Sequence, residues 1–562
     1  SMEQWHQASL ASADRIHFNK AGYDLQADLM ASALLEQVEN YSQFVALKEA
    51  GKPKKNQLFE KLAGIFKYDE NEPLLFTSYI FLGIFTLFFG LFLLVYKNVK
   101  HRNIYLLLFS LFFYYKAGGY YFVLLLLSTV IDFTLGNKIF KAGSLKGKKT
   151  WMVASVVSNL LLLSFFKYSY LVVDGINYAL STNLEVVNWF AVISNGLFSS
   201  SLDTAYIFLP VGISFYTFQT MSYSIDIYRG KLKPVESVWD FAFFVSFFPQ
   251  LVAGPIVRAS QFIPQIKEKY HISKDKFIRA FSLISLGVVK KVVVSDYIAT
   301  NFVDRVFDNP SLYTGFENLL ASYGYAIQIF CDFSGYSDIA IGLALLLGFT
   351  LPANFNAPYL SLSIAEFWRK WHISLSSWLK DYLYISLGGN RKGKIKTYRN
   401  LFLTMLLGGL WHGAAVRFIL WGVLHGVALA IHKIWKEQFP NAPTSIWYKV
   451  LMWLITFHFV VFTFVLFRAT DFATVKLIMA NIFTSIEWAG IPQILAAHKS
   501  VITVMLAGFL IQIIPDSFNI KTKVNLGRGL KWVGVAVALF AIVFMAHQFN
   551  TAGSQPFIYF QF

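Results

Sequence analysis

The sequence is poor in charged residues and in cysteine. Asp, Glu, Lys and Arg make up only 14% of its 562 residues, whereas soluble proteins have about 25%. A single cysteine, Cys331, excludes an intrachain disulfide and a metal site built from cysteines. Apolar residues make up 56% of the chain and aromatic residues 18%. This composition excludes an ordinary soluble protein and predicts a membrane protein.

Long uncharged apolar runs follow one another from about residue 74. The clearest are residues 74–96 and 151–166, the second of which continues past Lys167. A helix of about 20 apolar residues crosses the ~30 Å hydrocarbon core of a bilayer, and we count about ten to twelve such segments. We therefore expect an all-α polytopic membrane protein. Because the first apolar run begins only near Leu74, we expect no cleaved signal peptide.

The formal net charge of +17 comes from short basic clusters between the apolar runs, not from one basic domain. Successive clusters are separated by two predicted crossings, so all lie on one side, which the positive-inside rule makes the cytoplasm. Residues 174–203 contain no Lys or Arg and are expected outside, together with residues 1–72. The pattern predicts membrane lipids, and not nucleic acid, as partners. The clusters are Lys97, Lys100 and Arg102; Lys138, Lys141, Lys146, Lys148 and Lys149; and Arg229, Lys231 and Lys233.

Two histidines stand in segments that otherwise look like membrane helices. His372 lies in "AEFWRKWHISLSSWLKDYLYISLGGN" and His412 in "LLGGLWHGAAVRFILWG", with a basic loop between them. We expect two helices joined at the Gly-Gly-Asn turn. At 1.5 Å per residue, His372 lies roughly 23 Å from Leu387 and His412 roughly 20 Å from Arg399. The two imidazoles are therefore expected at a similar depth inside the membrane.

Ionisable side chains inside a membrane are costly and usually face a protein interior or a water-filled cavity. Loss of hydration favours the neutral imidazole, which can accept a proton as a general base. His412 is surrounded in sequence by small residues, which we expect to leave room for a substrate. The alternative is a histidine that only hydrogen-bonds between helices, the role that we expect for His425 and His458. The small residues are Gly408, Gly409, Gly413, Ala414 and Ala415.

Six sequence blocks, in order, resemble the membrane-bound O-acyltransferase (MBOAT) family, in particular its bacterial alginate O-acetyltransferase-like branch, over about residues 74–562. The blocks are "FLPVGISFYTFQTMSYSIDIYRG" (208–230), "FFPQLVAGPIVR" (247–258), "IFCDFSGYSDIAIGLALLLGF" (329–349), "NFNAPYLSLSIAEFWRKWHISLSSWLKDYLYISLGGNRKG" (354–393), "GGLWHGAAVRFILWGVLHG" (408–426) and "FVLFRA" (464–469). The resemblance implies a ring of about eleven transmembrane helices around a central tunnel, in the bacterial cytoplasmic (inner) membrane.

The resemblance further implies that His412 is the family's catalytic histidine and that His372 is its second histidine. In the implied reaction, an acyl thioester from the cytoplasm meets an acceptor hydroxyl from outside. Such O-acyl transfer needs a base and oxyanion donors but no metal. We expect His412 to act as the base, with attack by the imidazole as a nucleophile left open. His372 is expected to orient the acceptor or to assist proton movement, and Trp371 and Trp411 are candidate tunnel residues.

Other polar residues are candidates for the tunnel or for contact with the donor. Asp332 and Asp338 in "CDFSGYSD" lie about 240° apart around a helix, so we expect no shared metal site. We expect them, with Ser334, to break and pin helices around the tunnel; direct contact with substrate is the alternative. Gly254-Pro255 predicts a helix break, and beyond it Arg258 is a candidate contact for a lipid phosphate or the donor.

The basic loop after residue 390 is a candidate for binding the donor, either acetyl-coenzyme A or the thioester of an acyl carrier protein. Arg391, Lys392 and Lys394 are the candidate contacts, and anionic lipid headgroups are the alternative ligand. The leading functional hypothesis is O-acetylation of an extracytoplasmic cell-envelope polysaccharide, such as an alginate-like exopolysaccharide or peptidoglycan. The alternatives are D-alanyl transfer to teichoic acid from a carrier protein and a non-enzymatic transporter or channel. The motif blocks argue against transport.

The segment "ASADRIHFNKAGYDLQADLMASALL" resembles the last block of SGNH (GDSL-type) hydrolases, in which an Asp-x-x-His pair completes a catalytic triad. Asp14 and His17 match this pair, but the family's nucleophile and oxyanion blocks are not in this sequence, so no triad can form from this chain alone. We expect residues 1–45 to be an extracytoplasmic remnant of such a domain, 46–73 a linker with an interfacial segment, and 74–562 the transmembrane acyltransferase domain. An SGNH-type periplasmic acyltransferase is an expected partner.

Overall fold

The computed structural model describes residues 64, 66–69, 73–198, 203–441, 443–513 and 557–558. The chain divides into two units, Ser1–Tyr68 and Asp69–Phe562. The SGNH-like segment with Asp14 and His17 lies outside the described residues, as does most of the predicted linker. Every regular element in the described ranges is helical, as the sequence predicts.

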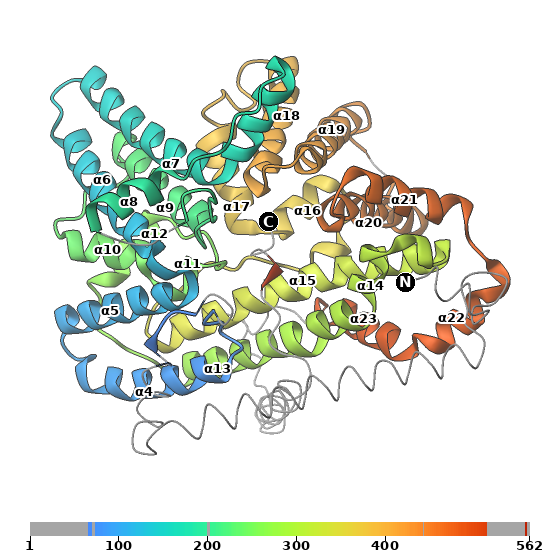
Figure 1. Cartoon of the computed structure of the whole chain (residues 1–562), viewed down its shortest axis with the longest axis horizontal. Helices are drawn as coiled ribbons and strands as arrows, with labels where there is room; N and C mark the ends of the chain where they lie inside the picture. Colours follow the sequence, from blue (N-terminus) through green and yellow to red (C-terminus); the bar gives the residue numbers. More distant parts are fainter. Residues whose placement is uncertain are drawn as a thin grey trace. The chain divides into compact units, whose positions relative to one another are not determined.

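The second unit opens with the helices from α4 to α12. They are α4 (Tyr79–Val95), α5 (Val99–Gly118), α6 (Phe122–Lys141), α7 (Leu145–Leu180), α8 (Trp189–Phe198), α9 (Ile213–Tyr228), α10 (Val238–Ser246), α11 (Phe248–Leu251) and α12 (Ala259–Ile266) (Figure 1). The gap between α11 and α12 contains Gly254-Pro255, which confirms the predicted break. Helix α9 packs against both α6 and α7.

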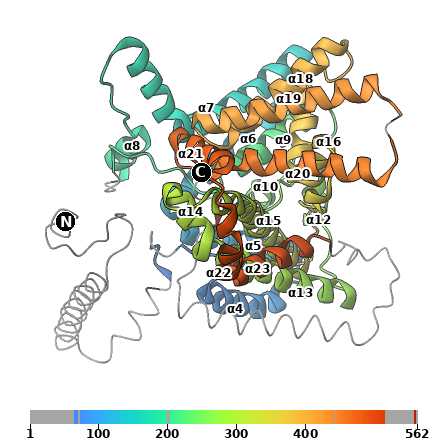
Figure 2. The same cartoon turned by 90° about the vertical axis from the view of Figure 1, so that its right-hand side faces the viewer.

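The remaining helices build the half of the unit that contains both candidate histidines. They are α13 (Lys274–Val288), two π-helical segments (Val289–Asp296 and Ala299–Val303), α14 (Asp304–Asp308), α15 (Gly315–Leu346), α16 (Ile364–Lys370), α17 (Ile373–Trp378), a π-helical segment (Leu379–Tyr384), α18 (Lys394–His412), α19 (Val416–Gln438), α20 (Ile446–Arg468), α21 (Phe472–Thr484), α22 (Ile491–Ala497) and α23 (Lys499–Ile511). Helices α18 and α19 lie side by side (Figure 2).

Polar side chains fix where these apolar helices begin. Ser78 accepts a hydrogen bond from the backbone N–H of Phe81 at the start of α4. At the start of α15, Thr314 and Glu317 form a reciprocal capping box. Such caps satisfy backbone donors that have no partner inside the helix. They explain why a long apolar run begins its helix at one defined residue.

Among the described residues, five helical stretches are long and apolar enough to cross a membrane: Val99–Lys141, Leu145–Leu180, Gly315–Leu346, Val416–Gln438 and Ile446–Arg468. The pair Trp488–Ala497 and Lys499–Ile511 is bent by 81° and adds a sixth candidate if it is one span. These helices confirm the all-α polytopic membrane fold. The count of about eleven crossings stays a prediction.

Helix α15 is the buried centre of the unit, whereas other spans present apolar side chains outward. In its apolar window 94% of the residues are buried, compared with 22% for α7. Helices α13 and α15 approach closely at Gly335, where an added Cβ would lie 2.7 Å from the carbonyl oxygen of Gly287. Glycines allow membrane helices to pack backbone against backbone. On α7, Leu161 is 65% exposed, as expected of a side chain that faces lipid.

Candidate active site

His412 is the last residue of α18 and lies in a pocket of aromatic rings from three helices. Its ring centroid is 4.9 Å from that of Trp411, 5.2 Å from Trp421 of α19 and 5.0 Å from Phe467 of α20. The side chain is buried, with 7% of its surface exposed. The chain turns extended at Gly413, so the imidazole stands where a helix ends and not within one.

Gly409 and Gly413 beside His412 serve helix packing, so they do not provide the room for a substrate that we expected there. A Cβ on Gly409 would lie 2.3 Å from the carbonyl oxygen of Phe418, and one on Gly422 of α19 would lie 2.5 Å from that of Met405. A Cβ on Gly413 would lie 2.2 Å from the ring of Phe418. The space is therefore filled by α19, whose backbone these glycines allow to approach α18.

His372 does not lie within a helix, contrary to the prediction from sequence. It separates α16 from α17 and has a positive φ of 43°. Its backbone carbonyl accepts from the N–H of Ser376, while the next N–H, of Ile373, donates to the backbone carbonyl of Asn354. The prediction of one continuous helix from His372 to the Gly-Gly-Asn turn, from which we expected a similar depth for the two imidazoles, is therefore wrong.

Asn354 holds the His372 side chain and was not singled out in the sequence. Its Oδ1 lies 3.1 Å from His372 Nδ1 and also accepts from the Ser374 hydroxyl at 2.8 Å and the Ser374 N–H at 3.2 Å. Because this oxygen is the acceptor, Nδ1 of His372 carries the hydrogen and the basic lone pair lies on Nε2. The motif "NFNAPY" contained Asn354, but nothing in its local pattern indicated contact with a histidine 18 positions away.

The structure brings His372 and His412 to the same tryptophan. The ring centroid of Trp411 lies 6.3 Å from that of His372 and 4.9 Å from that of His412. Phe218 of α9 stacks on Trp411 at 5.3 Å. Trp371 packs instead on Phe464 of α20, at 5.2 Å, and thus supports the segment next to His372. Three distant parts of the sequence, namely α9, the segment of His372 and the end of α18, therefore meet at the Trp411 indole ring.

Asp332 and Asp338 lie in the middle of the unbroken helix α15, so the prediction that they break helices is wrong. Asp332 forms an ion pair with Lys291 at 2.6 Å, and Asp338 forms one with Lys290 at 2.7 Å. These lysines follow α13 directly, so the two pairs fasten α15 to the preceding segment. Ser334 is buried, and its hydroxyl has no hydrogen-bond partner among the residues that the structure describes.

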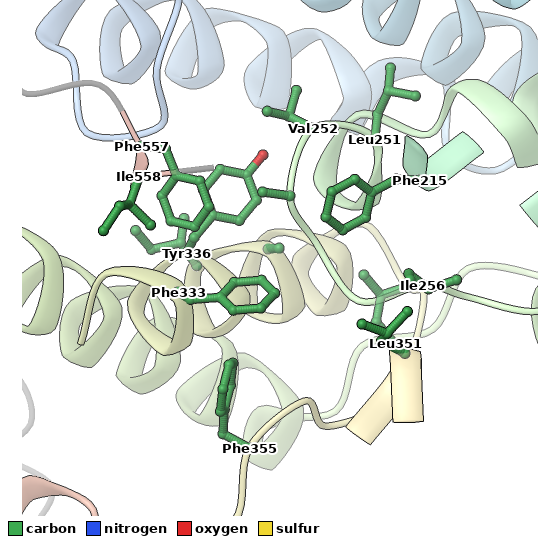
Figure 3. Close-up of a cluster of buried hydrophobic side chains, with 14 of the residues drawn as sticks. Phe215, Leu251, Val252, Ile256, Phe333, Tyr336, Leu351, Phe355, Phe557 and Ile558 are labelled. Atoms are coloured by element: carbon green, nitrogen blue, oxygen red, sulfur yellow. The ribbon is translucent and has the colours of Figure 1, made fainter. Parts of the chain in front are cut away.

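Two residues near the end of the chain reach the same part of α15. The N–H of Ile558 donates to Asp332 at 2.9 Å, and the ring of Phe557 lies 4.7 Å from that of Tyr336 (Figure 3). Phe333 of α15 lies between Phe557, at 6.0 Å, and His372, at 4.6 Å. A single aromatic ring, that of Phe333, therefore lies between Phe557 and His372.

Two of the basic candidates form ion pairs within the protein, and two lie exposed in a loop. Arg258 forms an ion pair with Asp381 at 2.7 Å and its guanidinium carbon lies 5.5 Å from the Tyr382 ring centroid. It thus has a partner within the protein that the sequence did not indicate. Lys394 pairs with Glu437 at 3.1 Å, whereas Arg391 and Lys392 are exposed in the loop before α18. In the described part of the chain, no group of three or more His, Cys, Asp or Glu residues is arranged to hold a metal ion.

Comparison with known proteins identifies the family. Residues 230–473 match the model of the membrane-bound O-acyltransferase family. A probable alginate O-acetylase of Pseudomonas syringae is 41% identical over 74% of this chain and 76% of its own length. A peptidoglycan O-acetyltransferase of Helicobacter pylori is 36% identical over 71% of this chain and 77% of its own.

A more distant relative has a different named activity. A teichoic acid D-alanyltransferase of Bacillus subtilis is 32% identical over 47% of this chain and 69% of its own length. The family match spans both histidines and the ion pairs of α15. The chain therefore belongs to the membrane-bound O-acyltransferase family and is an O-acyltransferase enzyme of the membrane.

Proposed function

We propose that this enzyme moves an acetyl group from a cytoplasmic thioester to hydroxyls of an extracytoplasmic cell-envelope polysaccharide, directly or through a partner acyltransferase. The observation that carries the proposal is the pair of buried histidines on one tryptophan, one of them held in a defined tautomer by Asn354. The names of the alginate and peptidoglycan acetylating relatives support acetyl as the acyl group and a glycan as the acceptor.

In the proposed step, His412 takes the proton of the acceptor hydroxyl as its oxygen attacks the thioester carbonyl. The tetrahedral intermediate then expels the thiolate by breaking the C–S bond, and the imidazolium returns the proton to that sulfur. His372 orients the acceptor through Nε2, which Asn354 leaves as the basic nitrogen. The aromatic rings around His412 exclude bulk water, which protects the thioester from hydrolysis. A tunnel reaching the imidazole from both membrane faces is part of the proposal.

We propose Arg391, Lys392 and Lys394 as the residues that receive the donor on the cytoplasmic side. Arg391 and Lys392 precede α18 and Lys394 is its first residue, so a donor bound there would send its acyl arm toward the far end of that helix. In this orientation the N-terminus lies outside the bacterial inner membrane. That placement suits an SGNH-type periplasmic partner for the segment with Asp14 and His17.

The test compares ester-linked acetate on envelope glycans in cells that carry the wild-type protein, His412→Ala or His458→Gln as their only copy. The His458 variant is the control, since that histidine bonds Tyr323 at 2.7 Å away from the proposed site. Membrane abundance is measured in parallel. We expect His412→Ala to lose the ester at normal abundance. Normal ester content in this variant would remove His412 from the mechanism.

Transfer of D-alanine is the second candidate because of the D-alanyltransferase relative. Mass spectrometry of the group released from the glycan by mild base distinguishes acetate from alanine. We expect acetate. Release of D-alanine that depends on His412 would retain the proposed chemistry and change the acyl group.

A further inference from the structure

We infer that Lys167 and Tyr168 of α7 are positioning residues for His412, because together they cap the end of the helix that carries it. This inference rests on the proposed role of His412. The ammonium group of Lys167 donates to the backbone carbonyl of Trp411. The hydroxyl of Tyr168 donates to the backbone carbonyl of Leu410 at 2.8 Å. Two adjacent side chains of one helix thus bind two adjacent carbonyls of another.

These carbonyls are the ones that a helix cannot satisfy itself. The last four C=O groups of an α-helix have no partner within it, and Leu410 and Trp411 belong to the last turn of α18. Within a membrane no water replaces the missing donors, so they must come from other side chains. A cation at this end also interacts favourably with the helix dipole. Lys167 and Tyr168 supply both effects next to the residue proposed as the base.

The position of Lys167 is otherwise difficult to explain. It interrupts an apolar stretch of α7, where a lysine is costly and usually marks a functional site. None of the ion pairs in the described part of the chain involves Lys167. Its ammonium nitrogen also lies 5.8 Å from the Trp411 ring centroid. Both the backbone and the ring of the residue before His412 therefore contact this one side chain.

The cap ties the catalytic helix to a distant part of the protein. Lys167 and Trp411 are 244 positions apart, and α7 otherwise packs on α6 and α9. Because Gly413 follows in an extended conformation, the end of α18 has no further helical turn to hold it. Losing the cap should let the last turn fray and turn the His412 imidazole out of its reactive orientation.

The experiment compares Lys167→Met, Lys167→Arg and Tyr168→Phe with Tyr170→Phe as the matched control. Tyr170 lies on the same helix, but its hydroxyl accepts from the N–H of Ile207 at 3.0 Å. Each variant is the only copy in cells, and the initial rate of glycan ester formation is divided by the amount of folded protein, measured by size exclusion of a fluorescent fusion. We expect Lys167→Met to lower this rate per molecule by about 10- to 100-fold, because small misplacements of a catalytic group have effects of this size.

Rescue by the conservative variant separates positioning from simple stability. Lys167→Arg keeps a cationic donor and should recover most of the rate per molecule. Tyr168→Phe should lower this rate less than Lys167→Met does. Tyr170→Phe should have the wild-type rate. A wild-type rate per molecule in Lys167→Met would overturn the inference, as would Lys167→Arg being as poor as Lys167→Met. If Lys167→Met does not fold, the rates of Lys167→Arg and Tyr168→Phe still show whether the two side chains position His412. An active His412→Ala variant would instead contradict the proposed function itself.

Discussion

His425 and His372 are both completely buried in the same membrane domain, yet their surroundings differ. Trp368 donates its indole N–H to His425 Nδ1 at 3.2 Å, so His425 Nε2 carries the hydrogen and bonds Thr463 at 3.1 Å. Both ring nitrogens of His425 are thus used to join α16, α19 and α20. Asn354 fixes His372 through Nδ1 and leaves the basic lone pair at Nε2. Two equally buried histidines therefore differ in which ring nitrogen carries the hydrogen, and this difference is consistent with the separate roles that we propose for them.

The largest expected effect comes from replacing His412, the proposed base, with glutamine, and His425, which joins three helices, serves as the comparison. His412→Gln should lower the rate per folded molecule by about 10²- to 10⁴-fold, the usual contribution of a general base. His425→Gln should leave that rate within a few-fold of wild type and instead lower the free energy of unfolding by about 1–3 kcal/mol, since a buried hydrogen bond is lost. Thermal melting in detergent and glycan ester content measure the two effects. Equal losses of rate in both variants would contradict separate roles for His412 in the reaction and His425 in packing.

The next effect concerns the amide that holds His372. Asn354→Ala removes the acceptor of His372 Nδ1 and of Ser374. We expect a loss of rate of about 10- to 100-fold, because a small misplacement of a group in the site has an effect of this size. Asn354→Asp keeps the acceptor oxygen and serves as the control, with a smaller loss of rate. If both variants retain full rate, the tautomer of His372 is not important for the reaction.

A smaller effect should follow from filling the α18–α19 contact. Gly409→Ala places a Cβ against the Phe418 carbonyl, and overpacking of this kind costs about 1–3 kcal/mol. Gly408→Ala is the matched control, since its Cβ would meet only Leu379 at an ordinary 3.4 Å. The melting temperature should fall for the first variant and stay unchanged for the second. Equal melting temperatures would contradict the close approach of the two helices.

The smallest effect is expected at the basic loop. Lys394→Ala removes an exposed ion pair with Glu437, and exposed pairs contribute little to stability. We expect an unchanged melting temperature and an unchanged rate when the donor is abundant. If the loop receives the donor, Arg391→Gln combined with Lys392→Gln should reduce the rate when the donor is scarce. No reduction would favour lipid headgroups as the ligands of this loop.

The apolar runs and the helix break at Gly254-Pro255 could be predicted because each depends on local composition. The break at His372 could not, since "WHIS" contains neither Gly nor Pro. It depends on Asn354, which binds the backbone of Ile373 and the side chain of His372 from 18 positions away. Likewise, "CDFSGYSD" looked like a helix breaker because its partners, Lys290 and Lys291, are far away in sequence. Neutralised by these lysines, its carboxylates are compatible with a continuous helix.

The left-handed backbone at position 372 limits which amino acids can stand there. A positive φ is uncommon for residues other than glycine, and Asn, Asp and His are several-fold enriched among them; the observed value is 43°. Among these four, histidine alone has a side chain that exchanges protons near neutral pH. Under the proposed function, a variant such as His372→Asn, which is compatible with this chain path, would still lose the imidazole that we propose to orient the acceptor.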